Sequence, residues 1–293
     1  MMFKRLVSVS LTVIFALLLS VLSVAQSKDE SAASGDIGWT SYIQFAGSSN
    51  ADGQILQLNS SVGYTFTRHF GADIGIPVYF VHASSSNTSG ISGNGVGNPF
   101  ADLRWKVLNP AVNYLSVLTG SAPLGDSKLG LSTGRATFDW TNHFDHSFAM
   151  VTPFVEAGLS NTTADSALFV RPYTTLGMNG HFLGGARIAI WNRVNVGGSL
   201  YDIAPFGNQT VFSRVSGTPA NSAGSHGRSF QTAQQTTGTA VIARDNGFSA
   251  FAIYSPSPII DAELGYTRSV HYDLNTVSFS LGFNVGRLLR DSK

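Results

Sequence analysis

The histidines, serines and acids of two loop segments are the residues of this chain that could catalyse a reaction. His271 lies between Ser269 and Asp273 in SVHYD, and His226 follows Ser225 in GSHGRS. A hydrolase needs these residue types in one hydrogen-bonded arrangement, which spacing along a loop does not establish. The chain has no H-x-x-x-H pair and no acidic cluster that could hold a metal ion. We therefore predict no catalytic, cofactor or metal site, and expect both histidines in solvated loops.

A second set of ionisable residues recurs in the middle of segments that alternate apolar and polar side chains. Successive side chains of a strand point to opposite faces, so these charges share the polar faces of their strands. Charges are tolerated there if the face borders a water-filled lumen. The residues that we predict to line such a lumen are Asp73, Asp102, Arg104, Lys106, Arg135, Asp139, Glu156, Arg187, Asp261 and Glu263.

Strands must position these residues. In TVSFSLGFNV the apolar residues Val277, Phe279, Leu281, Phe283 and Val285 alternate with polar or small ones. Segments 113–120 and 247–254 alternate less cleanly and are predicted from their spacing. Segments of about ten residues suit tilted strands that cross a bilayer. The twelve predicted strands are 39–45, 56–66, 72–80, 101–107, 113–120, 135–143, 151–159, 181–190, 194–200, 247–254, 260–266 and 276–285.

The connections between these segments alternate between two kinds. TRHFG, NPAV, FDHS, WNR and SPSP are short and turn-like. The others are mostly long and rich in Ser, Gly, Asn and Thr. Tight turns on one side and long loops on the other are typical of outer-membrane barrels. The predicted loops are 46–53, 84–98, 124–133, 161–179, 206–246 and 271–275.

Aromatic residues near the strand ends help to separate a barrel from a secreted β-sandwich. A sandwich also alternates, but its loops need not sort by side and its core seldom needs such aromatics. Girdles at the lipid interface explain Trp39, Tyr64, Phe66, Trp105, Trp140, Phe182 and Tyr266. We predict an all-β fold, a transmembrane antiparallel up-and-down β-barrel of about 12 strands. The last strand is expected to close the barrel against 39–45.

The N-terminus predicts export. Lys4 and Arg5 precede an apolar run that ends in Val24-Ala25, which is the pattern of a secretory signal peptide cleaved after Ala25. An uncleaved anchor helix is disfavoured, because the polar stretch QSKDESAASGD follows at once. We expect a signal peptide at 1–25, a short periplasmic segment at 26–36, a barrel at 37–288 and a C-terminal tail at 289–293.

The composition of the chain limits the classes of partner that we expect. The 293 residues carry a formal charge of +1, 12% charged residues and no Cys. The absence of Cys excludes disulfides and thiolate metal sites, and the near-neutral charge gives no reason to expect nucleic acid as a partner. The expected partners are outer-membrane lipid, small-molecule solutes and the barrel-assembly machinery.

Two stretches carry a resemblance to a known family. GNGVGNPFADLRWKVL (93–108) and VLTGSAPLGDSKLGLSTGRATFDW (117–140) resemble the Gly-rich, Asn-Pro and P-x-G-D…G-x-G pattern of the outer-membrane meta-pathway phenol-degradation family. That family is related to the fatty acid and aromatic hydrocarbon transport barrels. Its usual P-T-G-D reads Pro123-Leu124-Gly125-Asp126 here. The resemblance covers 53–160 best, and implies passive passage of small, often hydrophobic molecules through the outer membrane.

Twelve strands lie between an eight-stranded barrel, which side chains fill, and a sixteen-stranded aqueous channel. Small residues on the predicted lumen face favour a passage for small apolar or amphipathic solutes, and the mixed charges argue against a strongly ion-selective ring. The alternatives are a salt-bridged interior that seals the bore, a structural or adhesive barrel with 206–246 as its working loop, and an enzyme at the barrel rim. The small residues are Gly63, Gly75, Gly158, Gly185, Gly197, Gly282, Ser61, Ser116, Ser278 and Ser280.

Overall fold

The computed structural model describes residues 37–291, apart from 52, 84–92, 128, 130, 163–172, 214–234 and 240–242. The predicted signal peptide (1–25) and periplasmic segment (26–36) lie outside the described residues, as does most of the loop 206–246.

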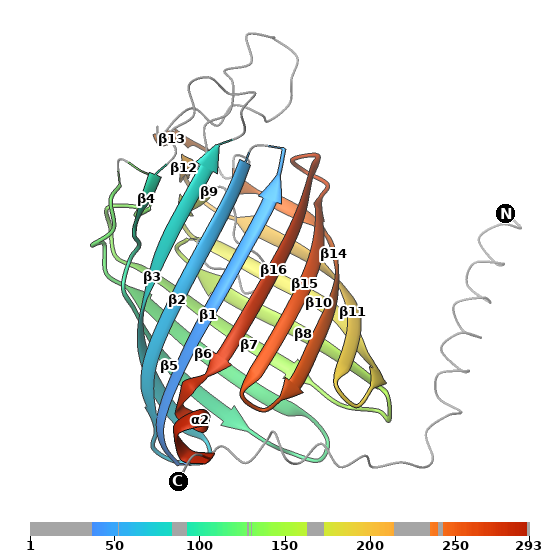
Figure 1. The fold of residues 1–293 in the computed structure, drawn as a ribbon. Helices are drawn as coiled ribbons and strands as arrows, with labels where there is room; N and C mark the ends of the chain where they lie inside the picture. Colours follow the sequence, from blue (N-terminus) through green and yellow to red (C-terminus); the bar gives the residue numbers. More distant parts are fainter. Residues whose placement is uncertain are drawn as a thin grey trace, which may run out of the picture.

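Twelve antiparallel strands form a closed barrel (Figure 1). Each strand pairs with its neighbours in the ring, and the last one pairs with the first, Tyr42 to Ser49 lying opposite Asn284 to Val277. The predicted fold class is therefore confirmed. The strands are β1 (Gly38–Asn50), β2 (Gly53–Thr65), β3 (Phe70–Ala83), β5 (Phe100–Val107), β6 (Asn113–Ser121), β7 (Thr137–Asp145), β8 (Val151–Ser160), β10 (Asn179–Trp191), β11 (Val194–Pro205), β14 (Asp245–Ser257), β15 (Ile260–Ser269) and β16 (Leu274–Asn284).

Smaller elements lie at the two ends of the barrel. β4 (Gly93–Val96) extends the sheet beside β3, and a separate three-stranded sheet consists of β9 (Tyr173–Leu176), β12 (Gln209–Ser213) and β13 (Gln235–Gly238). The helix α2 (Val285–Asp291) follows β16, and Asn284 caps it by accepting a hydrogen bond from the backbone N–H of Arg287 at 2.9 Å. The sequence patterns do not predict this helix. No helix in the described part of the chain is long and apolar enough to span a membrane.

The connections sort by end, as predicted. Residues 66–69, 108–112, 146–150, 192–193 and 258–259 form short turns at the lower end in Figure 1, which we call the turn end. The upper end, the loop end, carries β4 and the three-stranded sheet. One predicted loop is wrong, because only residues 51–52 separate β1 from β2. The polar stretch before this turn stays in the strand because its backbone pairs with β16.

The outer wall of the barrel is apolar. On β16, Val277 and Phe279 are exposed on the outer face, whereas Ser278 between them is buried on the inner face. The same alternation exposes Ile74 and Ile76 of β3. Among the outward-facing residues of the described strands, the carboxylate and guanidinium groups belong to Asp202 and Arg268 alone. This wall suits lipid rather than water.

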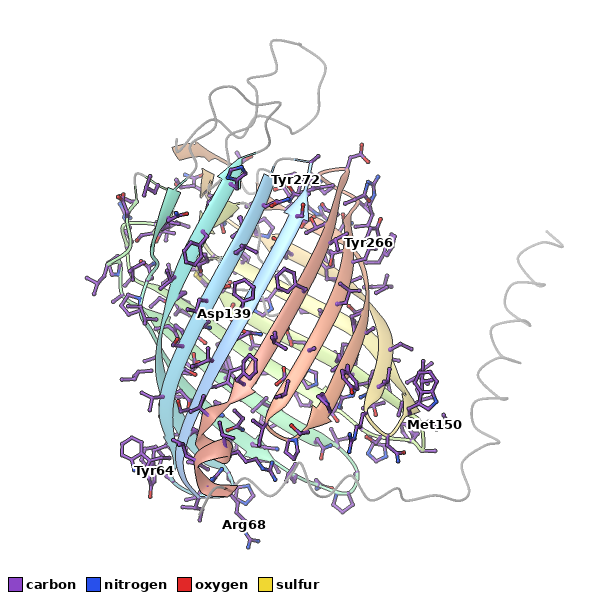
Figure 2. All side chains as sticks on the ribbon, in the orientation of Figure 1. Tyr64, Arg68, Asp139, Met150, Tyr266 and Tyr272 are labelled. Atoms are coloured by element: carbon purple, nitrogen blue, oxygen red, sulfur yellow. The ribbon has the colours of Figure 1, made fainter. Side chains whose placement is uncertain are left out.

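Aromatic side chains lie near both ends of the wall, and Figure 2 labels Tyr64 at the turn end and Tyr266 toward the loop end. At the turn end, the ring of Tyr64 lies 5.5 Å from Trp39 and 5.3 Å from Phe66. At the loop end, Tyr266 lies 6.4 Å from Phe248. These positions match aromatic girdles at two lipid–water interfaces.

Candidate functional site: the barrel lumen

The structure places nine of the ten predicted lumen residues on inward-facing positions of the strands. Arg135 is the exception: β7 begins at Thr137, so Arg135 lies in the preceding connection and is exposed. The other nine are Asp73 on β3, Asp102, Arg104 and Lys106 on β5, Asp139 on β7, Glu156 on β8, Arg187 on β10, and Asp261 and Glu263 on β15.

Asp73 is the centre of one polar contact group. Nε of Arg104 lies 2.7 Å from Oδ2 of Asp73, and the hydroxyl of Thr40 donates a 2.9 Å hydrogen bond to Oδ1 of Asp73. These contacts join β1, β3 and β5. Asp102, opposite Asp73 in the strand pairing, instead accepts a 2.6 Å hydrogen bond from Thr119 of β6.

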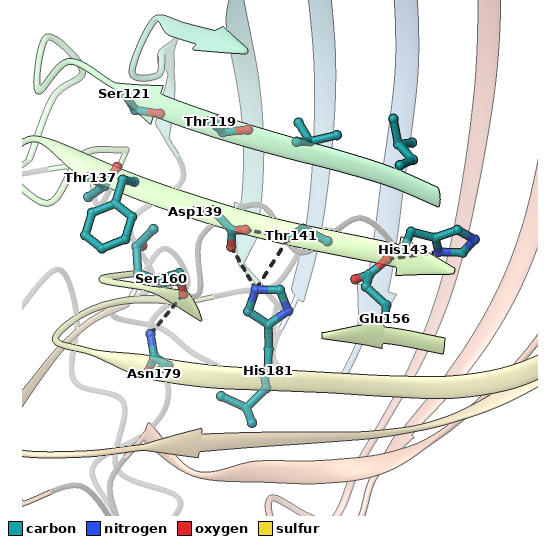
Figure 3. A pocket seen from close by; sticks show the side chains of 15 residues that line it. Thr119, Ser121, Thr137, Asp139, Thr141, His143, Glu156, Ser160, Asn179 and His181 are labelled. Carbon is teal, nitrogen blue, oxygen red and sulfur yellow. Dashed lines mark hydrogen bonds and ion pairs between the residues drawn. The ribbon is translucent and has the colours of Figure 1, made fainter. Parts of the chain in front are cut away.

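Two histidines contact carboxylates on the other side of the lumen (Figure 3). Nε2 of His181 lies 3.3 Å from Asp139, whose second oxygen accepts a 2.6 Å hydrogen bond from Thr141. The ring of His143 lies 3.6 Å from both Asp145 and Glu156.

Asp145 is an inward carboxylate that the set of lumen residues derived from the sequence omits. Nδ2 of Asn113 donates to it at 3.1 Å, and Nη2 of Arg187 lies 3.9 Å away. Its position two residues beyond His143 on β7 places it on the polar face, so the two-residue period could have found it.

Asp261 and Glu263 lie together on β15. The hydroxyl of Tyr42 donates to both carboxylate oxygens of Asp261, at 2.8 and 3.0 Å. Glu263 and Lys106 have no side-chain hydrogen bond or ion pair among the residues that the structure describes.

The lumen glycines do not simply leave space, which corrects the prediction from sequence. A methyl group on Gly63 would collide with Asp73, one on Gly158 with His181, and one on Gly282 with Tyr42. Each of these glycines thus lets side chains of the strands on either side of it meet across it. Phenylalanine rings cover the other three predicted lumen glycines: Phe100 lies over Gly75, Phe154 over Gly185 and Phe251 over Gly197.

One predicted lumen residue faces the other way. Ser116 accepts a 2.9 Å hydrogen bond from Nε1 of Trp140, whose side chain is exposed on the outer wall. Leu115 and Val117 of β6 therefore point inward. The alternation on β6 is hard to interpret from sequence because apolar residues occupy both faces.

A cavity of about 380 Å³ lies inside the barrel along β6, β7, β8, β10 and β11 (Figure 3). Leu115, Val117 and Ile203 give it apolar surface, and Asp139 and His181 contribute polar groups. Such a mixture can accept the apolar body of a solute on one side and its polar group on the other.

The connection from β6 to β7 fills part of the barrel at the loop end. Leu131 is 2% exposed and packs with Ile55, Tyr79 and Val81 on the inner faces of β2 and β3, with Leu129 beside them. The strands of this apolar cluster, β2 and β3, do not line the cavity. The lumen is therefore narrowed on its β2–β3 side by a segment that the sequence patterns predict as an ordinary loop.

The residues of the possible rim triad make other contacts. Ser269 donates to the buried carboxylate of Asp245, and Asp273 pairs with Arg268. His271 lies 4.9 Å from the ring of Tyr272. The three residues are not arranged as a Ser-His-Asp triad. Ser225 and His226 lie outside the described residues.

Comparison with solved structures finds proteins of similar architecture. An outer-membrane channel from Pseudomonas putida F1 aligns with a TM-score of 0.55 at 11% identity, covering 89% of this chain and 100% of that one. This chain has the fold of an outer-membrane channel. At such low identity the likeness establishes the fold alone.

Two porins align less well. The KdgM porin in complex with disordered oligogalacturonate gives a TM-score of 0.48 at 9% identity, covering 83% of this chain and 98% of that one. The NanC porin gives 0.48 at 7% identity, covering 82% and 98%. No family model matches the chain, so its resemblance to the phenol-degradation family is not confirmed. No curated protein matches it either.

Proposed function

We propose that this chain is an outer-membrane channel that admits small amphipathic molecules by diffusion through its lumen. The observation that carries the proposal is a closed barrel with an apolar outer wall and an internal cavity of about 380 Å³ that is lined by both apolar and polar side chains. The outer wall suits lipid, and the cavity offers surface to both parts of an amphipathic solute.

The proposed class of solute is supported by β6. Leu115 and Val117 supply aliphatic surface to this cavity, whose lining also includes Thr119, Asp139 and His181. The resemblance of 93–140 to the phenol-degradation family supports the same class of small, partly apolar solutes. Export is part of the proposal: residues 1–25 act as a signal peptide that is cleaved after Ala25, which N-terminal sequencing of the outer-membrane form would check.

A matched pair of substitutions tests the lumen path. Val117→Trp places a large ring in the cavity, whereas Leu118→Trp places the same ring on the outer wall, where Leu118 is already exposed. In liposome swelling assays with small amphipathic solutes, we expect Val117→Trp to slow uptake severalfold and Leu118→Trp to leave it unchanged. Equal rates for both variants, in a barrel that passes solute, would rule out a path along β6.

A sealed structural barrel is the second candidate. It is supported by the ion pairs of Arg104 and Arg187, by the covered glycines, and by the packing of Leu131 inside the barrel. It predicts a refolded protein of normal heat-modifiable mobility that passes neither ions nor solutes. The swelling assay on the wild-type protein therefore separates the two candidates.

A further inference from the structure

We propose that the lumen selects by charge and favours cations, so that small inorganic cations and organic amines pass more readily than anions of similar size. This inference rests on the proposed channel function and adds a substrate class to it.

The charges on the inner wall are unequal. Arg135 lies outside the strands, while Asp145 and Asp245 point inward from β7 and β14. Among the described strands, the inner faces therefore carry eight carboxylates but only three side chains that are always cationic, Arg104, Lys106 and Arg187. The balance of charged side chains on the inner wall is thus more acidic than the sequence alone indicates.

The contacts of these carboxylates decide how much of their charge remains. A guanidinium cancels the charge of its partner, and this happens at Asp73 and Asp145. A hydroxyl donor stabilises a carboxylate without cancelling its charge. Asp102 and Asp261 are hydrogen-bonded by the hydroxyls of Thr119 and Tyr42.

Glu263 adds a third carboxylate without a cationic partner among the described residues. Asp139 and Glu156 contact only histidines as basic partners. Even with both histidines charged, Asp102, Asp261 and Glu263 outnumber Lys106, the one always-charged inner cation of the described strands that has no carboxylate partner.

The barrel wall amplifies this imbalance. A lumen enclosed by apolar wall and lipid has low-dielectric surroundings, which focus the field of its fixed charges and raise the local concentration of counter-ions. Asp102 belongs to β5, and Asp261 and Glu263 to β15, so the uncompensated charges lie on well-separated parts of the circumference. An ion within the bore remains in their combined field.

The test is the reversal potential of the refolded protein in planar bilayers under a KCl gradient. One unit charge about 4 Å from an ion in water corresponds to a Boltzmann factor of about five, so we expect the wild type to favour K⁺ over Cl⁻ by at least about fivefold. Glu263→Gln should lower this ratio and Lys106→Gln should raise it. The control Asp202→Asn removes a carboxylate from the outer wall and should leave the ratio unchanged.

The possible outcomes separate this inference from the proposed function. An open channel with no preference, or with preference for Cl⁻, overturns the inference and leaves the channel intact. A cation preference that neither Glu263→Gln nor Lys106→Gln changes also overturns it, because the selectivity would then have another origin. A folded wild-type barrel without any conductance overturns both.

Discussion

At the scale of single residues, the inner glycines determine which side chains can meet. Thr40 contacts Asp73 across Gly63, Asp139 contacts His181 across Gly158, and Tyr42 contacts Asp261 across Gly282. Each contact joins strands that are not neighbours in the barrel. A side chain at the central position would separate the partners and leave a half-buried polar group without its hydrogen bond, which costs free energy.

Gly158→Ala should therefore destabilise the barrel by about 1–3 kcal/mol, because the added methyl group collides with His181 and crowds the backbone oxygen of Trp140. Gly184→Ala is the matched control, since a methyl group on Gly184 of β10 would have no atom of another residue within 4 Å, apart from its chain neighbours. We expect the control to be neutral or slightly stabilising. Urea unfolding of both variants in lipid vesicles would measure the difference, and equal stabilities would contradict the role given to Gly158.

The partners of individual charges could not be predicted from sequence. The two-residue period places Asp73, Asp102 and Arg104 on inner faces, but the pairing depends on the register between β3 and β5. Asp73 lies opposite Asp102, and Arg104 reaches Asp73 along the diagonal. Nothing in the local sequence of either strand specifies that register.

At the scale of elements, the alternation of apolar and polar residues predicts the strands, and each wrong prediction has a physical cause. All twelve predicted strands are present, and the pairing of β1 with β16 continues past Phe45 to Ser49. The predicted faces of β6 are wrong because Leu115 and Val117 are apolar but point into the lumen. The sequence does not predict α2 because seven residues are too few to establish a helical period.

The two faces of β16 should respond differently to charge. Leu281 faces outward, so Leu281→Arg should cost about 2–4 kcal/mol if it lies near the bilayer midplane. Ser280 faces inward opposite Glu263, so an arginine there can pair with that carboxylate and should be mild. Folding yield and unfolding free energy in vesicles would compare them. Similar costs at both positions would mean that the outer wall is not in lipid.

At the scale of the whole molecule, closure leaves the twelve-stranded ring without a free edge. Every strand of the ring pairs with a strand on each side. A bilayer requires this, because its interior holds no water that could form hydrogen bonds with backbone N–H and C=O groups. The ring also has two unlike ends. Outer-membrane barrels keep their short turns in the periplasm and their longer loops outside.

We therefore expect the turn end to face the periplasm. An epitope tag inserted after Ala51, in the turn at the loop end, should be reached by antibody on intact cells. A tag at Asn192, in the turn between β10 and β11, should be reached only after the outer membrane is permeabilised. Labelling at Asn192 on intact cells would show that the assigned orientation is reversed.

The side-chain contacts across the glycines also have a mechanical consequence. Strands joined only by backbone hydrogen bonds can slide and let a tube flatten into an ellipse. Here Asp261–Tyr42, Thr40–Asp73 and Asp73–Arg104 run around the circumference from β15 through β1 and β3 to β5. On a separate part of the circumference, the rings of Phe154 on β8 and Phe251 on β14 lie 6.3 Å apart. These side-chain contacts therefore resist a change in the width of the bore. Lateral pressure from the bilayer must separate the contacting side chains before it can deform the barrel.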